Sequence, residues 1–149
     1  MSGNLGGTMG GNWRPFLRAL ADEVDSVGGA AGRDALLREV GRRLARGHPL
    51  REASRIDVLE LEINDALAGM GWGSASLRVS EADRALLIEH TGLPGLGGAG
   101  DPPGTWLSAV LEGVYEVWMA ALPGADSSLS VRRVRATADG EVSLRYGRG

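Results

Sequence analysis

Residues 54–80 read SRIDVLELEINDALAGMGWGSASLRVS, and the spacing of the apolar residues changes within this stretch. As far as Met70 they recur at steps of three and four, which predicts an amphipathic helix from about Ser54 to Met70. Ser54 and Asp57 are suited to cap the amino terminus of this helix. From Ser74 to Ser80 the apolar residues alternate, which predicts a half-buried strand. A helix that leads through a glycine-rich turn into a strand indicates a fold that mixes the two.

Two further helices are predicted on the amino-terminal side. Their apolar stripes run through residues 13–27 and 31–45, and Gly28-Gly29 separates them. Residues 1–12 are rich in glycine and hold little that a core could bury. We therefore expect a flexible tail ahead of a single domain over residues 13–149.

The carboxy-terminal half predicts three more strands and one helix. Asp139-Gly140 is a strong hairpin-turn signal between the last two strands. The order ααα-ββ-α-ββ predicts an α+β fold, with helices packed on one small antiparallel sheet. The predicted elements are a strand at 86–90, a loop rich in glycine and proline at 92–104, a helix from Thr105 that stops before Pro123, and strands at 129–136 and 141–146.

The composition excludes several classes of protein. The 149 residues include no cysteine, so disulfides and cysteine metal sites are excluded. The net charge of −3 argues against a nucleic-acid partner, which usually requires a dominant basic field. No apolar run is long enough to span a bilayer and no secretory signal is visible, so we expect a soluble, cytoplasmic protein rather than a periplasmic one.

Few residues are placed for chemistry, and we expect no catalytic, metal or cofactor site. Asp101 lies in a loop, but a glycosidase needs a second carboxylate opposite it and the sequence indicates none. His48 and His90 are far apart in sequence, which favours structural hydrogen bonding over metal binding. An alternative to a structural role is a small-ligand-binding module with a pocket at the 92–104 loop.

Other residues are candidates for contacts with partners. Arg42, Arg43 and Arg46 lie in a stretch with few acidic neighbours, which fits either a solvated helix face or a docking strip for an acidic partner or a membrane leaflet. Trp13 and Arg14 follow the predicted tail, and an exposed tryptophan can stack on a glucose ring or a proline-rich ligand.

Gly113 is unusual inside a predicted helix, since glycine lowers helix propensity. A close crossing of two helices would explain it, and we predict a contact between subunits there. The tryptophans at 72, 106 and 118 lie among apolar residues and belong either to the core or to such an interface. The candidates for an interface between subunits are Trp72, Trp106, Gly113, Tyr115 and Trp118.

Several segments taken together resemble the cellulose synthase D-subunit family. They occur in the family's order and spacing across residues 36–123. They are LLREVG at 36–41, LEIN at 61–64 with MGWG at 70–73, IEH at 88–90 with Leu93-Pro94, and GTWL at 104–107 with LEGVY at 111–115 and Trp118.

The resemblance implies a small accessory subunit without enzyme activity. Such a subunit assists the export and ordered crystallisation of cellulose made by the synthase complex at the inner membrane. It implies a ring-like homo-octamer built from dimers, with inner passages for the β-1,4-glucan chain and amino-terminal segments near them. It also implies, in some bacteria, a proline-rich partner protein that organises the rings into a scaffold.

Overall fold

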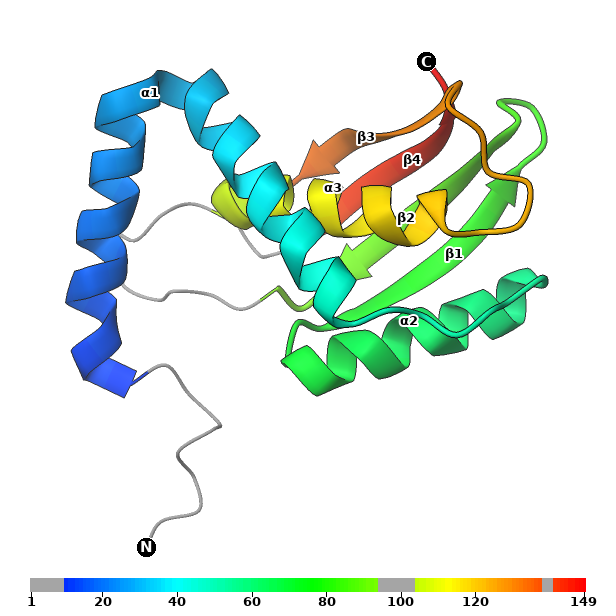
Figure 1. Cartoon of the computed structure of the whole chain (residues 1–149), viewed down its shortest axis with the longest axis horizontal. Coiled ribbons are helices and arrows are strands. Elements are labelled where there is room, and N and C mark those ends of the chain that lie inside the picture. The colour runs from blue at the N-terminus through cyan, green and yellow to red at the C-terminus, as the bar shows by residue number, and fades with distance from the viewer. Residues whose placement is uncertain (1–9, 94–103, 138–140) are drawn as a thin grey trace, which may run out of the picture.

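The computed structural model describes residues 10–93, 104–137 and 141–149 and has an α+β architecture (Figure 1). Its four strands form one antiparallel sheet in the order β1-β2-β4-β3. The predicted α+β class and the shared antiparallel sheet are therefore confirmed. The elements are α1 (Gly10–Gly47), α2 (Ile56–Met70), β1 (Ser74–Ser80), β2 (Ala85–Thr91), α3 (Gly104–Ala120), β3 (Leu129–Ala136) and β4 (Val142–Arg148).

The first two predicted helices are joined in one element, α1, which bends sharply at Gly29 (Figure 1). Gly29 has φ 65° and ψ −171°, a backbone conformation that is essentially restricted to glycine. The break predicted at Gly28-Gly29 is therefore present as an elbow rather than as a connecting loop. We call residues 10–28 the first arm and residues 30–47 the second arm. The first arm begins three residues before its predicted start at Trp13.

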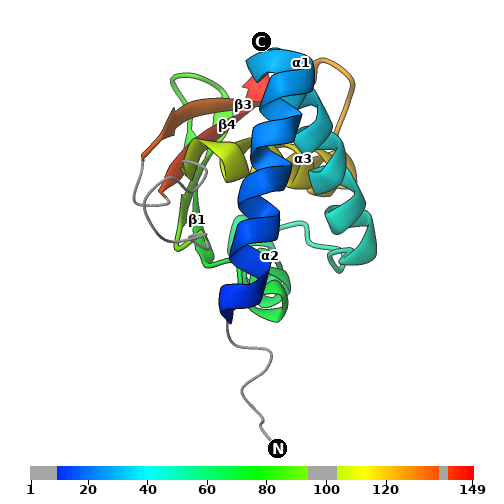
Figure 2. The same ribbon diagram turned by 90° about the vertical axis from the view of Figure 1, so that its left-hand side faces the viewer.

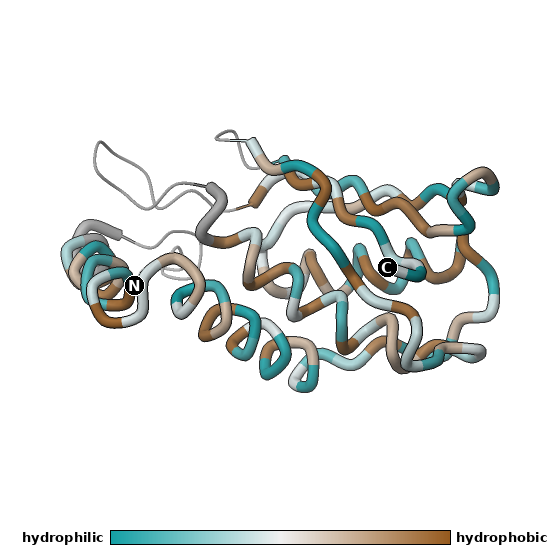
Figure 3. The backbone as a smooth tube through the Cα atoms, turned by 90° about the horizontal axis from the view of Figure 1, so that it is seen from above, coloured by the Kyte–Doolittle hydropathy of each residue, from teal (hydrophilic) through white to brown (hydrophobic). Residues whose placement is uncertain are grey.

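The second arm crosses α3 at a pair of glycines. A Cβ atom on Gly41 would lie 1.9 Å from the carbonyl oxygen of Val110, and one on Gly113 would lie 2.0 Å from that of Arg38. Each helix thus has a glycine where the backbone of the other passes. Seen from above, the sheet, α3 and the second arm form successive layers (Figure 3).

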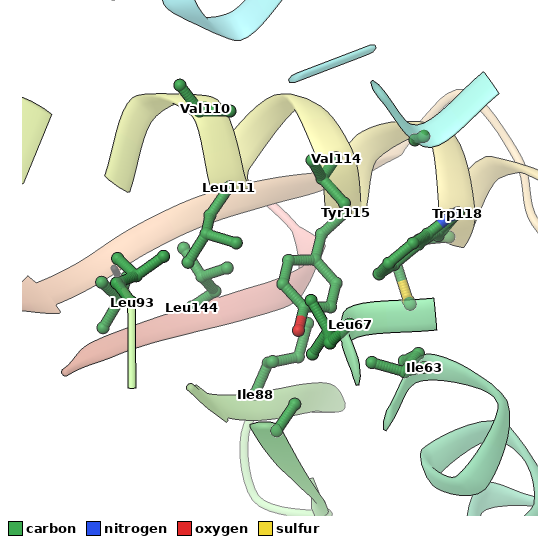
Figure 4. Packing of buried hydrophobic residues seen from close by; sticks show 14 of the residues in the cluster. Ile63, Leu67, Ile88, Leu93, Val110, Leu111, Val114, Tyr115, Trp118 and Leu144 are labelled. Carbon is green, nitrogen blue, oxygen red and sulfur yellow. The ribbon is translucent and has the colours of Figure 1, made fainter. Parts of the chain in front are cut away.

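The core lies between α3, the sheet and α2 (Figure 4). Tyr115 and Trp118 on α3 are buried, and their rings meet edge to face with centroids 5.5 Å apart. Ile88 and Leu144 meet them from β2 and β4, and α2 contributes its buried apolar ridge. The indole Nε1 of Trp118 also donates a hydrogen bond to the carbonyl of His48, which ties α3 to the end of the second arm.

Helix α2 runs beside the outer edge of β1 and satisfies backbone groups there. The Asn64 side chain accepts a hydrogen bond from the Ala75 amide (2.7 Å) and donates one to the Ala75 carbonyl (2.9 Å). One turn earlier, Glu60 accepts the amide of Leu77 at 2.7 Å. These bonds occupy groups that an edge strand would otherwise offer to another strand.

The predicted cap of α2 is wrong. The helix begins at Ile56, and Arg55 occupies the cap position without a side-chain cap bond. Asp57 instead accepts the guanidinium of Arg55, with Nη2–Oδ2 at 2.6 Å, and the amide of Val58. The helix begins two residues later than predicted, and Ser54 therefore lies ahead of the cap position.

The predicted bounds of β1 and β3 agree with the structure, and β2 is one residue longer at each end. Helix α3 begins one residue earlier than predicted and ends at Ala120, and β4 begins one residue later and ends two residues later than predicted. The Asp139-Gly140 turn and most of the 92–104 loop lie outside the described residues. In the part of the chain that is described, no helix is both long and apolar enough to cross a membrane.

Candidate functional site

A buried carboxylate, Glu112, joins three elements of the fold. Its Oε1 accepts the Nε of Arg38 on α1 at 2.7 Å, and its Oε2 accepts the Nε of Arg133 on β3 at 2.6 Å. The Nη2 of Arg133 also lies 3.6 Å from the Oδ2 of Asp34 on the second arm. Because both oxygens of Glu112 are engaged by guanidinium groups, this cluster is suited to hold α1, α3 and β3 together.

The predicted docking strip is partly neutralised within the chain. Arg42 donates to Glu116 on α3 at 2.8 Å and to Glu39 at 2.9 Å, and Arg46 lies 3.6 Å from Glu39. The hydrogen bond from Arg42 lowers the pKa of Glu39, and the same pairing raises the pKa of Arg42. Arg43 is exposed and forms no ion pair with any residue that the structure describes. A partner contact at this strip stays a prediction.

His90 is buried at the centre of a polar chain. Its Nε2 lies 2.7 Å from the carbonyl of Trp72, so this nitrogen is the donor and carries the hydrogen. Its Nδ1 then accepts the hydroxyl of Tyr115 at 3.2 Å. Burial lowers the pKa of His90 and raises the pKa of Tyr115. His90 is thus a neutral structural hydrogen-bonder.

Three of the predicted interface residues lie inside the chain. Gly113, Tyr115 and Trp118 are all buried, and the close crossing expected at Gly113 is made by α1 of the same chain. Trp72 is half-buried against the core. The side chain of Trp106 lies outside the described part, as do those of Trp13 and Arg14. An interface role for these residues stays a prediction.

The elbow of α1 carries exposed apolar residues that the sequence did not single out as a site. Val27 is 77% exposed on the first arm, and Leu36 is 50% exposed on the second. Leu20 and Val40 extend the same exposed stripe away from the elbow on either side. Between the arms lies a notch of about 270 Å³, lined by Glu23, Val24, Val27, Gly28, Gly32 and Leu36. The first arm itself stands away from the sheet and its helices (Figure 1), and it lies in front of them when the molecule is viewed from that side (Figure 2).

The pocket predicted at the 92–104 loop falls mostly outside the described residues. A groove of about 400 Å³ lies at the opposite end of β2, where Ala85 and Leu86 meet Tyr146 and Leu122. Its walls are mainly apolar side chains from α2, the sheet and the segment after α3. Within the described ranges, no three histidines or carboxylates are grouped as metal ligands would be.

Comparison with known proteins relates this fold to bacterial cellulose production. The sequence pattern of the cellulose synthase D-subunit family matches residues 7–147, and so extends beyond both ends of the resemblance at 36–123. Two proteins named "Cellulose synthase operon protein D" are similar to this chain over 118 residues, which is 79% of this chain and 76% of theirs. The one from Komagataeibacter xylinus is 41% identical and the one from Komagataeibacter sucrofermentans is 42% identical. The chain therefore belongs to the cellulose synthase D-subunit family and has an accessory role in cellulose synthesis.

Proposed function

We propose that this chain is a non-catalytic scaffold subunit of a cellulose-secreting complex and that it works as a homo-octamer. The observation that carries the proposal is the exposed apolar stripe of α1, which runs from Leu20 and Val27 across the elbow to Leu36 and Val40. Contiguous apolar surface of this kind marks sites of protein association. Family membership indicates the pathway, cellulose synthesis, and the stripe provides a surface through which copies of the chain can associate.

A second copy of the chain is a suitable partner for this stripe. The notch between the arms is concave and lined by Val24, Val27 and Leu36, whereas the first arm is a projecting helix with an apolar side. Each copy therefore has both a concave notch and a projecting helix that can enter the notch of another copy. Interfaces that repeat in this way form closed assemblies when the rotation between copies closes.

The state of the carboxylates supports a non-catalytic role. Glu112 and Glu116 are one helical turn apart on α3, a spacing that could suit paired acid and base groups. Both accept arginine guanidinium groups, and Glu112 has each oxygen occupied. These bonds tie α3 to α1 and β3, which is the role of a structural carboxylate.

We infer from the family that the assembled subunit acts on the cytoplasmic side of the inner-membrane synthase and assists glucan export and ordered crystallisation. Its proposed partners are other subunits of that complex, a β-1,4-glucan chain and a proline-rich protein. The relatives' name, which places them in a cellulose synthase operon, supports the first of these. The test is complementation of a cellulose-secreting bacterium that lacks its own member of this family. This chain should restore fibre yield and order, and failure despite normal expression would contradict the proposed role.

The assembly is tested by light scattering coupled to size-exclusion chromatography. One chain weighs 15.6 kDa, so an octamer weighs 8 × 15.6, or about 125 kDa. Leu20→Glu with Val27→Glu should reduce this mass to that of a smaller species, because charge enters the stripe. The matched control is Leu61→Glu on α2, at a residue that is 66% exposed, and it should leave the mass unchanged. A wild-type monomer would contradict the homo-octamer, and an intact octamer in the arm variant would exclude the stripe as its interface.

A further inference from the structure

The face of the sheet that points away from α3 carries a row of arginines. Arg78 on β1 is opposite Leu87 on β2, Leu87 is opposite Arg145 on β4, and Arg145 is opposite Arg132 on β3. Residues that are directly opposite one another in neighbouring strands share one face of the sheet. The adjacent positions Leu77, Ile88, Leu144 and Arg133 belong to the face that packs against the helices.

The next row on the same outer face adds a fourth arginine. Arg135 is opposite Ser143, and Ser143 is opposite Glu89. The hydroxyl of Ser143 donates to Glu89 at 2.6 Å, so the carboxylate of this row is engaged within the sheet. We call Arg78, Arg132, Arg135 and Arg145 the arginine face. With four arginines and Glu89 as the one acid in these two rows, its formal charge is +3, opposite in sign to the net charge of the chain.

The charges of the arginine face are not neutralised by any residue that the structure describes. Among the described residues, Arg78, Arg132 and Arg135 form no ion pair. Arg145 donates to two backbone carbonyls, those of Arg148 at 2.9 Å and Asp83 at 3.3 Å, which fix its guanidinium without cancelling its charge. By contrast, Arg38, Arg42 and Arg133 on the helix side are all paired with glutamates. In the described part of the chain, the unpaired arginines of the sheet thus form a group on one face, whereas on the second arm of α1 Arg43 alone is exposed without an ion pair.

We propose that the arginine face docks an acidic peptide segment of a partner protein. Neighbouring strands are about 4.8 Å apart, so Arg145 and Arg132 lie one strand spacing apart and Arg78 lies two spacings from Arg145 in a line across the sheet. Arginine pairs with carboxylates through two parallel hydrogen bonds, which favours carboxylate side chains as the ligands. Leu87, which is partly exposed between Arg78 and Arg145, provides an apolar contact in the same row.

Charge favours an acidic peptide over two other partners for a flat face, a second copy of the chain and an anionic lipid surface. Two copies of the arginine face placed against each other would oppose like charges, which disfavours a two-fold contact between subunits here. An anionic lipid surface would attract the face but would repel the remainder of a chain whose net charge is −3. A peptide contacts the face alone.

The test uses the full chain and a fluorescent decapeptide that alternates glutamate and serine, with a glutamine-serine decapeptide of equal length as the control ligand. Fluorescence anisotropy should show binding of the glutamate peptide alone, with an affinity that falls as salt is raised from about 50 to about 300 mM. Arg78→Ser with Arg132→Ser should weaken this binding about five- to tenfold, since each exposed pair contributes modestly. Arg51→Ser with Arg55→Ser removes the same charge from exposed arginines near α2 and should leave the affinity unchanged.

Three outcomes would overturn the proposal. The first is the absence of peptide binding by the wild-type chain, and the second is equal loss of affinity in both double variants. The third is flotation with vesicles of phosphatidylglycerol and phosphatidylcholine that depends on Arg78 and Arg132 while the peptide does not bind, which would assign the face to lipid. All four substituted arginines are exposed, so circular dichroism should show the wild-type fold in each variant. If a double variant does not fold, Arg78→Ser alone replaces it.

Discussion

The two arms of α1 carry apolar stripes of the same period but differ in how much of the stripe is covered, since the first arm buries Ala21 alone among its described side chains. The second arm turns Leu37, Gly41 and Ala45 into α3, where all three are buried. The first arm leaves Leu20 and Val27 exposed. A stripe of period 3.6 thus predicts an apolar helix face, but whether the rest of the chain covers that face depends on what the fold places opposite it.

The largest effect on stability is expected at the glycine crossing, where the second arm packs against α3. Gly41→Ala should destabilise the fold by about 3 kcal/mol, because the new methyl group meets the backbone of α3 and neither helix can move aside without loss of packing. Gly32 is exposed on the same arm, and a Cβ atom added there would have no neighbouring atom within 4 Å. Gly32→Ala should therefore raise stability by about 0.5 kcal/mol. Urea unfolding of the two variants measures the difference. Equal effects would mean that the crossing is looser than described.

The same close approach changes the expectation for Gly113. A large side chain at this position should unfold the protomer, because the contact that it breaks is between α3 and α1 of one chain. Gly113→Leu should therefore lose its near-ultraviolet circular dichroism signal together with any oligomer. Loss of the oligomer with a preserved signal would contradict this and would return Gly113 to the interface between subunits.

An intermediate effect is expected from the ion pairs of the two arms. Glu112→Ala leaves Arg38 and Arg133 without their shared carboxylate, and should cost about 2 kcal/mol after allowance for the partial exposure of both arginines. Asp25→Ala removes the pair with Arg33 that spans the elbow, at a side chain that is 49% exposed, and should cost less than about 0.5 kcal/mol. Thermal unfolding at low and high salt separates the two, since the exposed pair alone is strongly screened.

The smallest effect is on the pH dependence of stability, which distinguishes His90 from His48. The pKa of His90 is lowered in the folded chain, so the unfolded chain binds its proton more tightly. The resulting stability is present above the unfolded value of about 6.5 and is lost as the pH falls towards the folded pKa, with a slope of at most about 1.4 kcal/mol per pH unit. His90→Gln should remove this slope, whereas His48→Gln, at an exposed site after the second arm, should retain it. An unchanged slope in His90→Gln would assign the acid sensitivity to other groups.

Local patterns predicted the elements of the fold well. Alternation predicted β1 at its observed bounds, the predicted strand at 129–136 matches β3, and Gly28-Gly29 indicated the break in α1. The cap at Ser54 was wrong because Asp57 has a competing partner in Arg55, which propensity does not weigh. That Gly113 marks a close crossing was also predictable, but a sequence does not tell whether the second helix comes from the same chain.

The charged surfaces were less predictable, because they depend on contacts between distant residues. The strip at Arg42 is adjacent to few acids in sequence, but Glu116 reaches it from a position 74 residues away. The arginine face depends on the register of β1, β2, β4 and β3, which sets Arg78 in line with Arg132 and Arg145. The signal in the sequence was the surplus of arginines in the predicted strands, and it gains meaning only once the order of the strands is known.

The bonds from α2 to β1 limit how far these sheets can extend by pairing with one another. Asn64 and Glu60 occupy backbone groups on the outer side of β1, so strand addition is blocked at that edge. β3 forms the other edge of the sheet, where a strand of another copy could pair with it. The bulge and the arginines of β3 disfavour such pairing. Two copies that joined through β3 would leave no free edge on either side. Edge-to-edge growth by strand addition would therefore stop at a pair of chains.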